Sequence, residues 1–177
     1  MDEQDAARQY ILALVRAGVN RGERDRFDAF GYLLARIRHE TAIEFRSNLV
    51  GLHAPALWDA LDVLVMLGDL RHTVSSSGGE TITTWKLGSL PPGHRPITVD
   101  PELIIAAREL VAAASRVRAR STRSIAVAAK LVYAADHMPL PADLVKFSEE
   151  FRWRLEAGDA EAGVALARIL GLLPKGA

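Results

Sequence analysis

Cysteine is absent from this 177-residue sequence, so disulfides, thiolate nucleophiles and thiolate zinc sites are excluded. An excess of charge of either sign is also absent, because 22 lysines and arginines balance 22 aspartates and glutamates. There is therefore no overall field that attracts nucleic acid or anionic lipid, and any basic surface has to be local. The remaining composition, 49% hydrophobic and 25% charged, is that of an ordinary soluble globular protein.

A long hydrophobic run is missing as well. The most apolar stretch, residues 125–135, is too short to span a membrane and contains Lys130. The first residues are acidic rather than basic, and no apolar core of a signal peptide follows them directly. We therefore expect a cytoplasmic protein with no membrane segment.

The patterns that usually mark a catalytic or metal site are missing too. No glycine-rich loop follows a predicted strand, and the serines at residues 75–77 suit a hairpin turn better than a nucleophile. None of the histidines has a metal-ligand spacing such as His-Glu-x-x-His. These histidines are His39, His53, His72, His94 and His137. We expect no enzyme, no cofactor and no bound metal.

Helical periodicity is the strongest signal that is present. Asp2 can cap a first helix that runs to about Ala17, and a second amphipathic helix should follow. The proline-rich residues 91–96 form the clearest linker in the chain. We therefore expect an N-terminal domain over residues 1–90 and a C-terminal helical domain over residues 97–177.

Further helices are expected beyond this linker. Asp100 and Pro101 form a cap and first-turn pair for one helix, and another should cover residues 122–135. A third should end near Gly158, and Asp159 can cap the last one. The broad apolar faces of these helices predict burial against one another or against a second subunit.

The middle of the chain predicts a helix, a tight turn, a second helix and a hairpin in succession. Thr41 and Glu44 can form a capping box that starts the first of these helices, and Gly51 can end it in the left-handed conformation. Pro55 suits the first turn of the next helix. Residues 70–87 then supply two strands rich in β-branched side chains around a serine- and glycine-rich turn.

This succession resembles the winged helix-turn-helix superfamily, in the manner of the MarR-like bacterial regulators. The resemblance covers about residues 27–87 and lies in Leu49-Val50-Gly51-Leu52, in the leucine-spaced helix over residues 55–64, and in Leu67-Gly68-Asp69-Leu70. It implies a mainly α fold with a winged helix-turn-helix core, a two-stranded antiparallel wing and a C-terminal helical region. It also implies a homodimer that binds double-stranded DNA as a transcriptional regulator.

DNA binding would rest on basic residues outside the second helix of this motif. Those that could contact the DNA backbone, together with a histidine in the turn, are Arg36, Arg38, Arg46, His53, Arg71 and Lys86. A second basic group lies between Glu109 and Asp136, where no acidic residue occurs. Its members include Arg116, Arg118, Arg120 and Arg123. This group is either a plain solvated surface or a patch for nucleic acid or another polyanion.

The second helix of the motif favours a different function. A helix that reads DNA bases presents Arg, Lys, Asn or Gln, and residues 55–67 contain none of these. Its expected outward residues are Ala56, Trp58, Asp59, Asp62, Val63 and Met66, and the two carboxylates among them would repel phosphates. The candidates for a partner surface are Trp58, Asp59, Asp62 and Met66. Either Trp58 and Met66 pack under a neighbouring helix while the two aspartates are solvated, or these four residues bind a protein partner. A winged-helix adaptor is therefore the alternative to a DNA-binding regulator.

Overall fold

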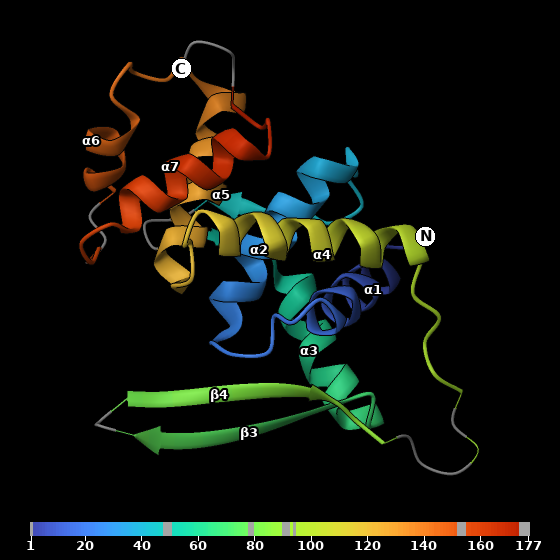
Figure 1. The fold of residues 1–177 in the computed structure, drawn as a ribbon. Coiled ribbons are helices and arrows are strands. Elements are labelled where there is room, and N and C mark those ends of the chain that lie inside the picture. The colour runs from blue at the N-terminus through green and yellow to red at the C-terminus, as the bar shows by residue number, and fades with distance from the viewer. Residues whose placement is uncertain are drawn as a thin grey trace.

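The computed structural model describes residues 2–47, 51–77, 80–89, 93, 95–151 and 155–173, and it is mainly helical. Its helices are α1 (Glu3–Arg16), α2 (Arg24–Arg38), α3 (Pro55–Leu67), α4 (Pro101–Arg116), α5 (Thr122–His137), α6 (Leu144–Glu149) and α7 (Asp159–Ile169). Its strands are β1 (Arg46–Ser47), β2 (Leu52–His53), β3 (Leu70–Ser77) and β4 (Glu80–Leu87). In Figure 1, β3 and β4 extend as a hairpin below the helices, whereas α6 and α7 lie at the opposite end of the molecule.

Two of the predicted helix caps are confirmed. The Asp2 side chain accepts a hydrogen bond from the Asp5 amide at 2.7 Å, which closes the first turn of α1. The Asp100 side chain accepts one from the Glu102 amide at 3.0 Å, and Pro101 occupies the first position of α4. Local sequence therefore determines where these two helices begin.

The C-terminal helices differ from the prediction at two points. α6 ends at Glu149, although the apolar pattern predicts a helix that continues to Gly158. α7 has Gly158 as its N-cap, with a φ of 89° that favours glycine, so the prediction that Asp159 caps this helix is wrong. The Asp159 carboxylate instead accepts the Glu156 amide at 2.9 Å and the Ser121 hydroxyl, and it thereby ties α7 to the start of α5.

The helix predicted to begin at Thr41 is also wrong, because the chain is irregular from there to β1. The capping box does not form: the Glu44 amide donates to the Glu3 carboxylate at 2.9 Å. Ile43 is buried, and Phe45 packs against the core. Contacts with distant parts of the chain therefore override the local helix signal.

A short antiparallel ladder of β1 and β2 replaces this helix, and it pairs Arg46 with His53. Arg46 therefore lies on a strand rather than on a helix. Residues 48–50, which carry part of the winged-helix resemblance, lie outside the described residues. α3 begins at Pro55 as predicted and ends at Gly68, whose φ is 84°.

β3 and β4 form the predicted antiparallel hairpin, and both strands extend closer to the turn than the sequence indicates. Residues 78–79, the glycines of the predicted turn, lie outside the described residues. The other edge of β4 pairs with residues 20–22, because the Trp85 amide donates to the Asn20 carbonyl at 2.8 Å. The connection between α1 and α2 is thus fastened to the hairpin.

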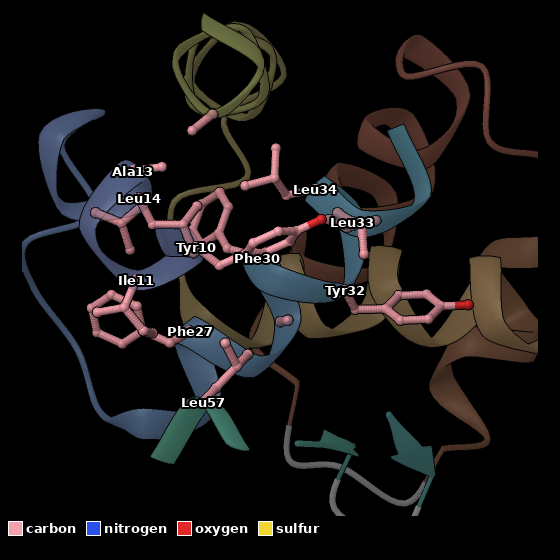
Figure 2. Close-up of a cluster of buried hydrophobic side chains, with 14 of the residues drawn as sticks. Tyr10, Ile11, Ala13, Leu14, Phe27, Phe30, Tyr32, Leu33, Leu34 and Leu57 are labelled. Carbon is pink, nitrogen blue, oxygen red and sulfur yellow. The ribbon is translucent and has the colours of Figure 1, made fainter. Parts of the chain in front are cut away.

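The core surrounds α2. Figure 2 shows Phe27 and Phe30 of α2 facing Tyr10 and Ile11 of α1, with Leu57 of α3 beside them. All of these side chains are at most 2% exposed. Each buried side chain of this size contributes roughly 1.5–3 kcal/mol to folding. α1, α2 and α3 are therefore held together mainly by apolar burial.

The same cluster continues beyond the predicted linker. Leu110 of α4 and Val132 of α5 are fully buried in it, and the Arg36 side chain of α2 pairs with Asp136 of α5 at 2.8 Å. Residues 91, 92 and 94 of the linker lie outside the described part of the chain. No helix in the described ranges is long and apolar enough to cross a membrane.

Candidate functional site

A groove of about 500 Å³ lies between α3 and one face of the β3–β4 hairpin. Trp58 and Val65 line it from α3, and His72, Val74 and Trp85 line it from the hairpin. The hairpin residues share one face because His72 lies opposite Trp85 in the ladder, and Val74 follows two residues later along β3. Residues at the start of α2 complete the lining, so the groove is built by tertiary structure rather than by one motif.

Trp58 is fixed in the groove by a buried carboxylate of α2. Asp28 is 1% exposed, and it accepts the indole N–H of Trp58 through Oδ2 at 2.8 Å and the Ala54 amide through Oδ1 at 3.1 Å. The His53 Nδ1 lies 3.6 Å from Oδ2, and the His53 ring meets the Trp58 ring edge-on at 4.5 Å. Burial raises the pKa of Asp28 to about 6, although the hydrogen bonds and His53 oppose the rise. Since burying an unpaired carboxylate is costly, Asp28 and Trp58 hold each other in place.

An arginine from the start of α2 lies over this tryptophan. The Arg24 Cζ is 5.6 Å from the centroid of the Trp58 ring. Arg24 also forms a two-pronged ion pair with Asp62 of α3, in which Nη1 donates to Oδ2 at 3.0 Å and Nη2 donates to Oδ1. The Arg24 side chain is 38% exposed and the Asp62 side chain 62% exposed, so solvent screens the pair and it adds little stability.

The described lining of the groove carries more negative than positive charge. Glu23, Asp25 and Asp62 contribute carboxylates, and Arg24 contributes a cation. Partial burial, and then the neighbouring Glu23, raise the pKa of Asp25. Val74 adds an apolar side chain that is 60% exposed. An apolar and aromatic surface with acidic neighbours suits a ligand that is both apolar and cationic.

Three of the arginines predicted to contact DNA are paired with carboxylates of the chain itself. Arg36 pairs with Asp136 at 2.8 Å, and Arg46 pairs with Glu44 at 2.9 Å. Arg38 contacts three acidic side chains at 3.0 to 3.3 Å. These are Glu40, Asp100 and Glu102. Each of the three arginines would have to share or leave its own partner before it could contact a phosphate.

The other predicted DNA contacts lie on two different faces. Arg71 and Lys86 are exposed and lie opposite each other in the β3–β4 ladder. Because successive strand residues point to opposite faces, both belong to the face of the hairpin away from the groove. The His53 ring packs against Trp58 instead. The structure therefore does not bring the predicted set together on one surface.

The second basic group lies around the connection between α4 and α5. Arg116 is the last residue of α4. The connection to α5 contains Arg118 and Arg120, and Arg123 lies in the first turn of α5. All four are exposed, or nearly so, and Arg123 lies 3.8 Å from Glu156. The carboxylates of Asp159 and Glu161, on α7, line the same hollow as Arg118 and Arg120. The loop is thus a surface of mixed charge.

The predicted partner-binding residues are partly brought together. Trp58 and Asp62 line the groove, whereas Asp59 and Met66 are exposed on α3 outside its lining. Most of the residues that sequence reasoning missed come from other elements, and they include Glu23, Arg24, Asp25, Asp28, His72, Val74 and Trp85. Asp28 carried a signal, because it is the one charged residue within the apolar residues 27–35.

Within the described residues, no group of three or more histidine or acidic side chains could hold a metal ion. Comparisons of the chain with family models, with curated proteins and with solved structures find no match. The protein is therefore described by its own structure, which is mainly helical with an antiparallel hairpin beside an acidic, aromatic groove. The homodimer stays a prediction.

Proposed function

We propose that this protein is a winged-helix adaptor that binds a segment of a protein partner in the groove between α3 and the hairpin. The order of α1, α2, α3 and β3–β4 supports the winged-helix assignment, with α2 in place of the helix predicted to begin at Thr41. The pairing of residues 20–22 with β4 adds a link between the helices and the wing. The connection from His39 to Ala54 is longer than the tight turn expected from the sequence.

The chemistry of the α3 surface is the observation that carries this proposal. Asp59 and Asp62 are exposed there, together with Met66, which is 79% exposed. A DNA backbone placed against this surface would bring phosphates close to both carboxylates; Asp62 is already paired with Arg24, so repulsion from Asp59 would oppose binding. A protein segment with an apolar side chain and a positive charge meets no such repulsion.

The shape of the groove also favours a protein segment. Its volume of about 500 Å³ accommodates a few side chains, and Val65 and Val74 provide apolar contacts within it. Glu23 and Asp25 lie beside these contacts and would attract a lysine or arginine of the partner. The expected ligand is therefore a short segment in which basic and large apolar residues alternate or adjoin.

A displayed library of random twelve-residue peptides tests the proposal with no assumption about the sequence of the partner. Selection against the purified chain should enrich peptides in which a basic residue adjoins a large apolar residue. The dissociation constant of a selected peptide should rise at least tenfold in Val74→Asp, because the new carboxylate lies in the apolar part of the groove. Ile105→Asp on α4 is the matched control, since Ile105 is 54% exposed, similar to Val74 at 60%.

Two results would count against a partner-binding groove. One is a selection that enriches no peptide, and the other is binding that Val74→Asp and Ile105→Asp weaken equally. Both variants change exposed positions, so their thermal unfolding should match that of the unchanged chain. That measurement separates loss of binding from loss of fold.

DNA binding by the outer face of the hairpin is the second candidate, because Arg71 and Lys86 lie side by side there and are exposed. Fluorescence anisotropy with duplex DNA across a salt series tests it in parallel. Phosphate contacts would give an affinity that falls steeply with salt, and Arg71→Glu would reduce the slope. A flat, weak signal at low salt would leave the groove as the functional surface.

A further inference from the structure

The groove already holds a cation that belongs to the chain itself. The guanidinium of Arg24 lies over the Trp58 ring and occupies both carboxylate oxygens of Asp62. A planar group that lies over an aromatic ring and is paired through two nitrogens makes two of the contacts by which arginine is recognised. The site is thus shaped for a guanidinium, and its present occupant is internal.

We propose that the groove recognises an arginine of the partner, and that Arg24 is an internal competitor which this arginine displaces from Trp58 and Asp62. The inference rests on the proposed function and names the residue type that the groove selects. A partner guanidinium cannot form the same two-pronged pair with Asp62 while Arg24 holds it. Binding and release of Arg24 are therefore coupled.

The surroundings make this exchange feasible. Trp58 stays in position when Arg24 leaves, because Asp28 holds its indole N–H at 2.8 Å from the buried side. The Arg24–Asp62 pair is exposed to solvent, and such pairs are easily opened. Glu23 and Asp25 lie next to the site and draw a second cation toward it.

Arginine is favoured over lysine by the geometry of the acceptor. The ammonium of lysine is a compact and strongly hydrated charge that cannot make two parallel hydrogen bonds to one carboxylate. It also lacks a planar surface to lie on the Trp58 ring. A lysine-bearing segment should therefore gain the general attraction of the acidic groove but not the contacts that Arg24 now makes.

Paired probes test this directly. The peptide Gly-Leu-Arg-Leu-Gly-NH2, labelled with fluorescein on its N-terminal amine, and its lysine counterpart are titrated with the full chain, and anisotropy gives the dissociation constants. If Arg24 closes the groove in about 80–90% of molecules, Arg24→Gln should raise the affinity for the arginine peptide about five- to tenfold, because apparent affinity scales with the open fraction. Once Arg24 has been replaced in this way, adding Asp62→Asn should weaken binding of the arginine peptide about tenfold, because the acceptor is then lost with no competitor to release.

Arg24→Lys separates displacement from a change in charge. This variant keeps the positive charge but loses the planar fork, so it should retain most of the rise in affinity for the arginine peptide. Arg21→Gln removes an exposed charge in the neighbouring connection and should leave both affinities unchanged. Circular dichroism of each variant confirms that the helices are intact.

The inference is overturned if Arg24→Gln strengthens the two peptides equally and Arg24→Lys strengthens neither, because charge alone would then explain the effect. It is also overturned if neither peptide binds any variant. The proposed function survives separately if selected peptides bind the groove, lose affinity in Val74→Asp and contain no arginine. The two ideas can therefore fail independently.

Discussion

The buried Asp28 carboxylate should make the stability of this protein depend on pH in an unusual direction. Burial raises its pKa from an ordinary value of 3.8 to about 6 in the folded chain. The folded state therefore binds a proton between about pH 4 and pH 6 that the unfolded state does not bind. It follows that the contribution of Asp28 to stability is greatest below about pH 4, falls as pH rises through 6, and is constant above that.

The size of the effect follows from the same shift. A difference of about two pKa units at about 1.4 kcal/mol each corresponds to about 3 kcal/mol between pH 4 and pH 7. Asp28→Asn has no proton to bind and should lose this dependence. The free energy of unfolding of Asp28→Asn minus that of the unchanged chain should therefore increase by about 3 kcal/mol between pH 4 and pH 7. This change does not depend on the absolute stability of the variant.

Urea unfolding followed by tryptophan fluorescence measures this difference at several pH values between 4 and 7.5. Only the difference between the two chains matters, because other carboxylates titrate equally in both. His53→Gln is the control, since the His53 Nδ1 lies 3.6 Å from the same carboxylate and its charge lowers the pKa of Asp28. This variant keeps the Asp28 carboxylate and should therefore keep the pH dependence. Parallel stability curves for the unchanged chain and Asp28→Asn would refute the reasoning, because they would show that Asp28 titrates alike in the folded and unfolded states.

Two further predictions concern the contacts that join the helices. Gly163→Ala should destabilise the fold by about 1–3 kcal/mol, because its Cβ would lie 2.5 Å from Cγ1 of Val127 on α5. The same Cβ would also lie 2.7 Å from the Ser124 carbonyl oxygen of α5, so trimming the Val127 side chain cannot relieve the clash. Thermal unfolding would show the loss, and a stabilised Gly163→Ala would contradict the close packing of α5 and α7. Asp136→Ala should cost about 1 kcal/mol, since the Tyr32 hydroxyl and Arg36 lose their acceptor between α2 and α5. An unchanged urea midpoint in this second variant would show that neither the hydrogen bond nor the ion pair stabilises the fold.

Elements with local determinants are those that the sequence predicted well. The caps at Asp2 and Asp100 need only a side chain and an amide two or three residues away, so they form regardless of the rest of the chain. The hairpin of residues 70–87 likewise depends on neighbouring strands and their turn. For such features the sequence and the structure agree because few distant contacts can alter them.

The capping box at Thr41 failed for the opposite reason. Its signal was local, but the Glu44 amide found a partner in Glu3, which lies far away in the sequence. Ile43 and Phe45 gain more from packing against the core than they would from one further turn of helix. Propensity is a weak preference, and tertiary packing reversed it here.

The groove could likewise be predicted only in part from the sequence. Trp58 and Asp62 could be expected on one helix face from their spacing alone, and both line the groove. Their partners Arg24 and Asp28 come from α2, and Trp85 comes from β4, so their proximity depends on how three elements pack. A sequence pattern predicts which residues share a face, but it does not predict which face of another element lies opposite.

The position of α2 has a consequence for the order in which the molecule can assemble. This helix is synthesised before α5, and its Tyr32 hydroxyl and Arg36 guanidinium bind Asp136, which lies about a hundred residues later in the chain. Until α5 has left the ribosome, the side of α2 that α5 covers stays open to water or to a chaperone. The contacts of α1 and α3 with α2 can form much sooner. Assembly would thus begin around the groove and end with the C-terminal helices closing over α2.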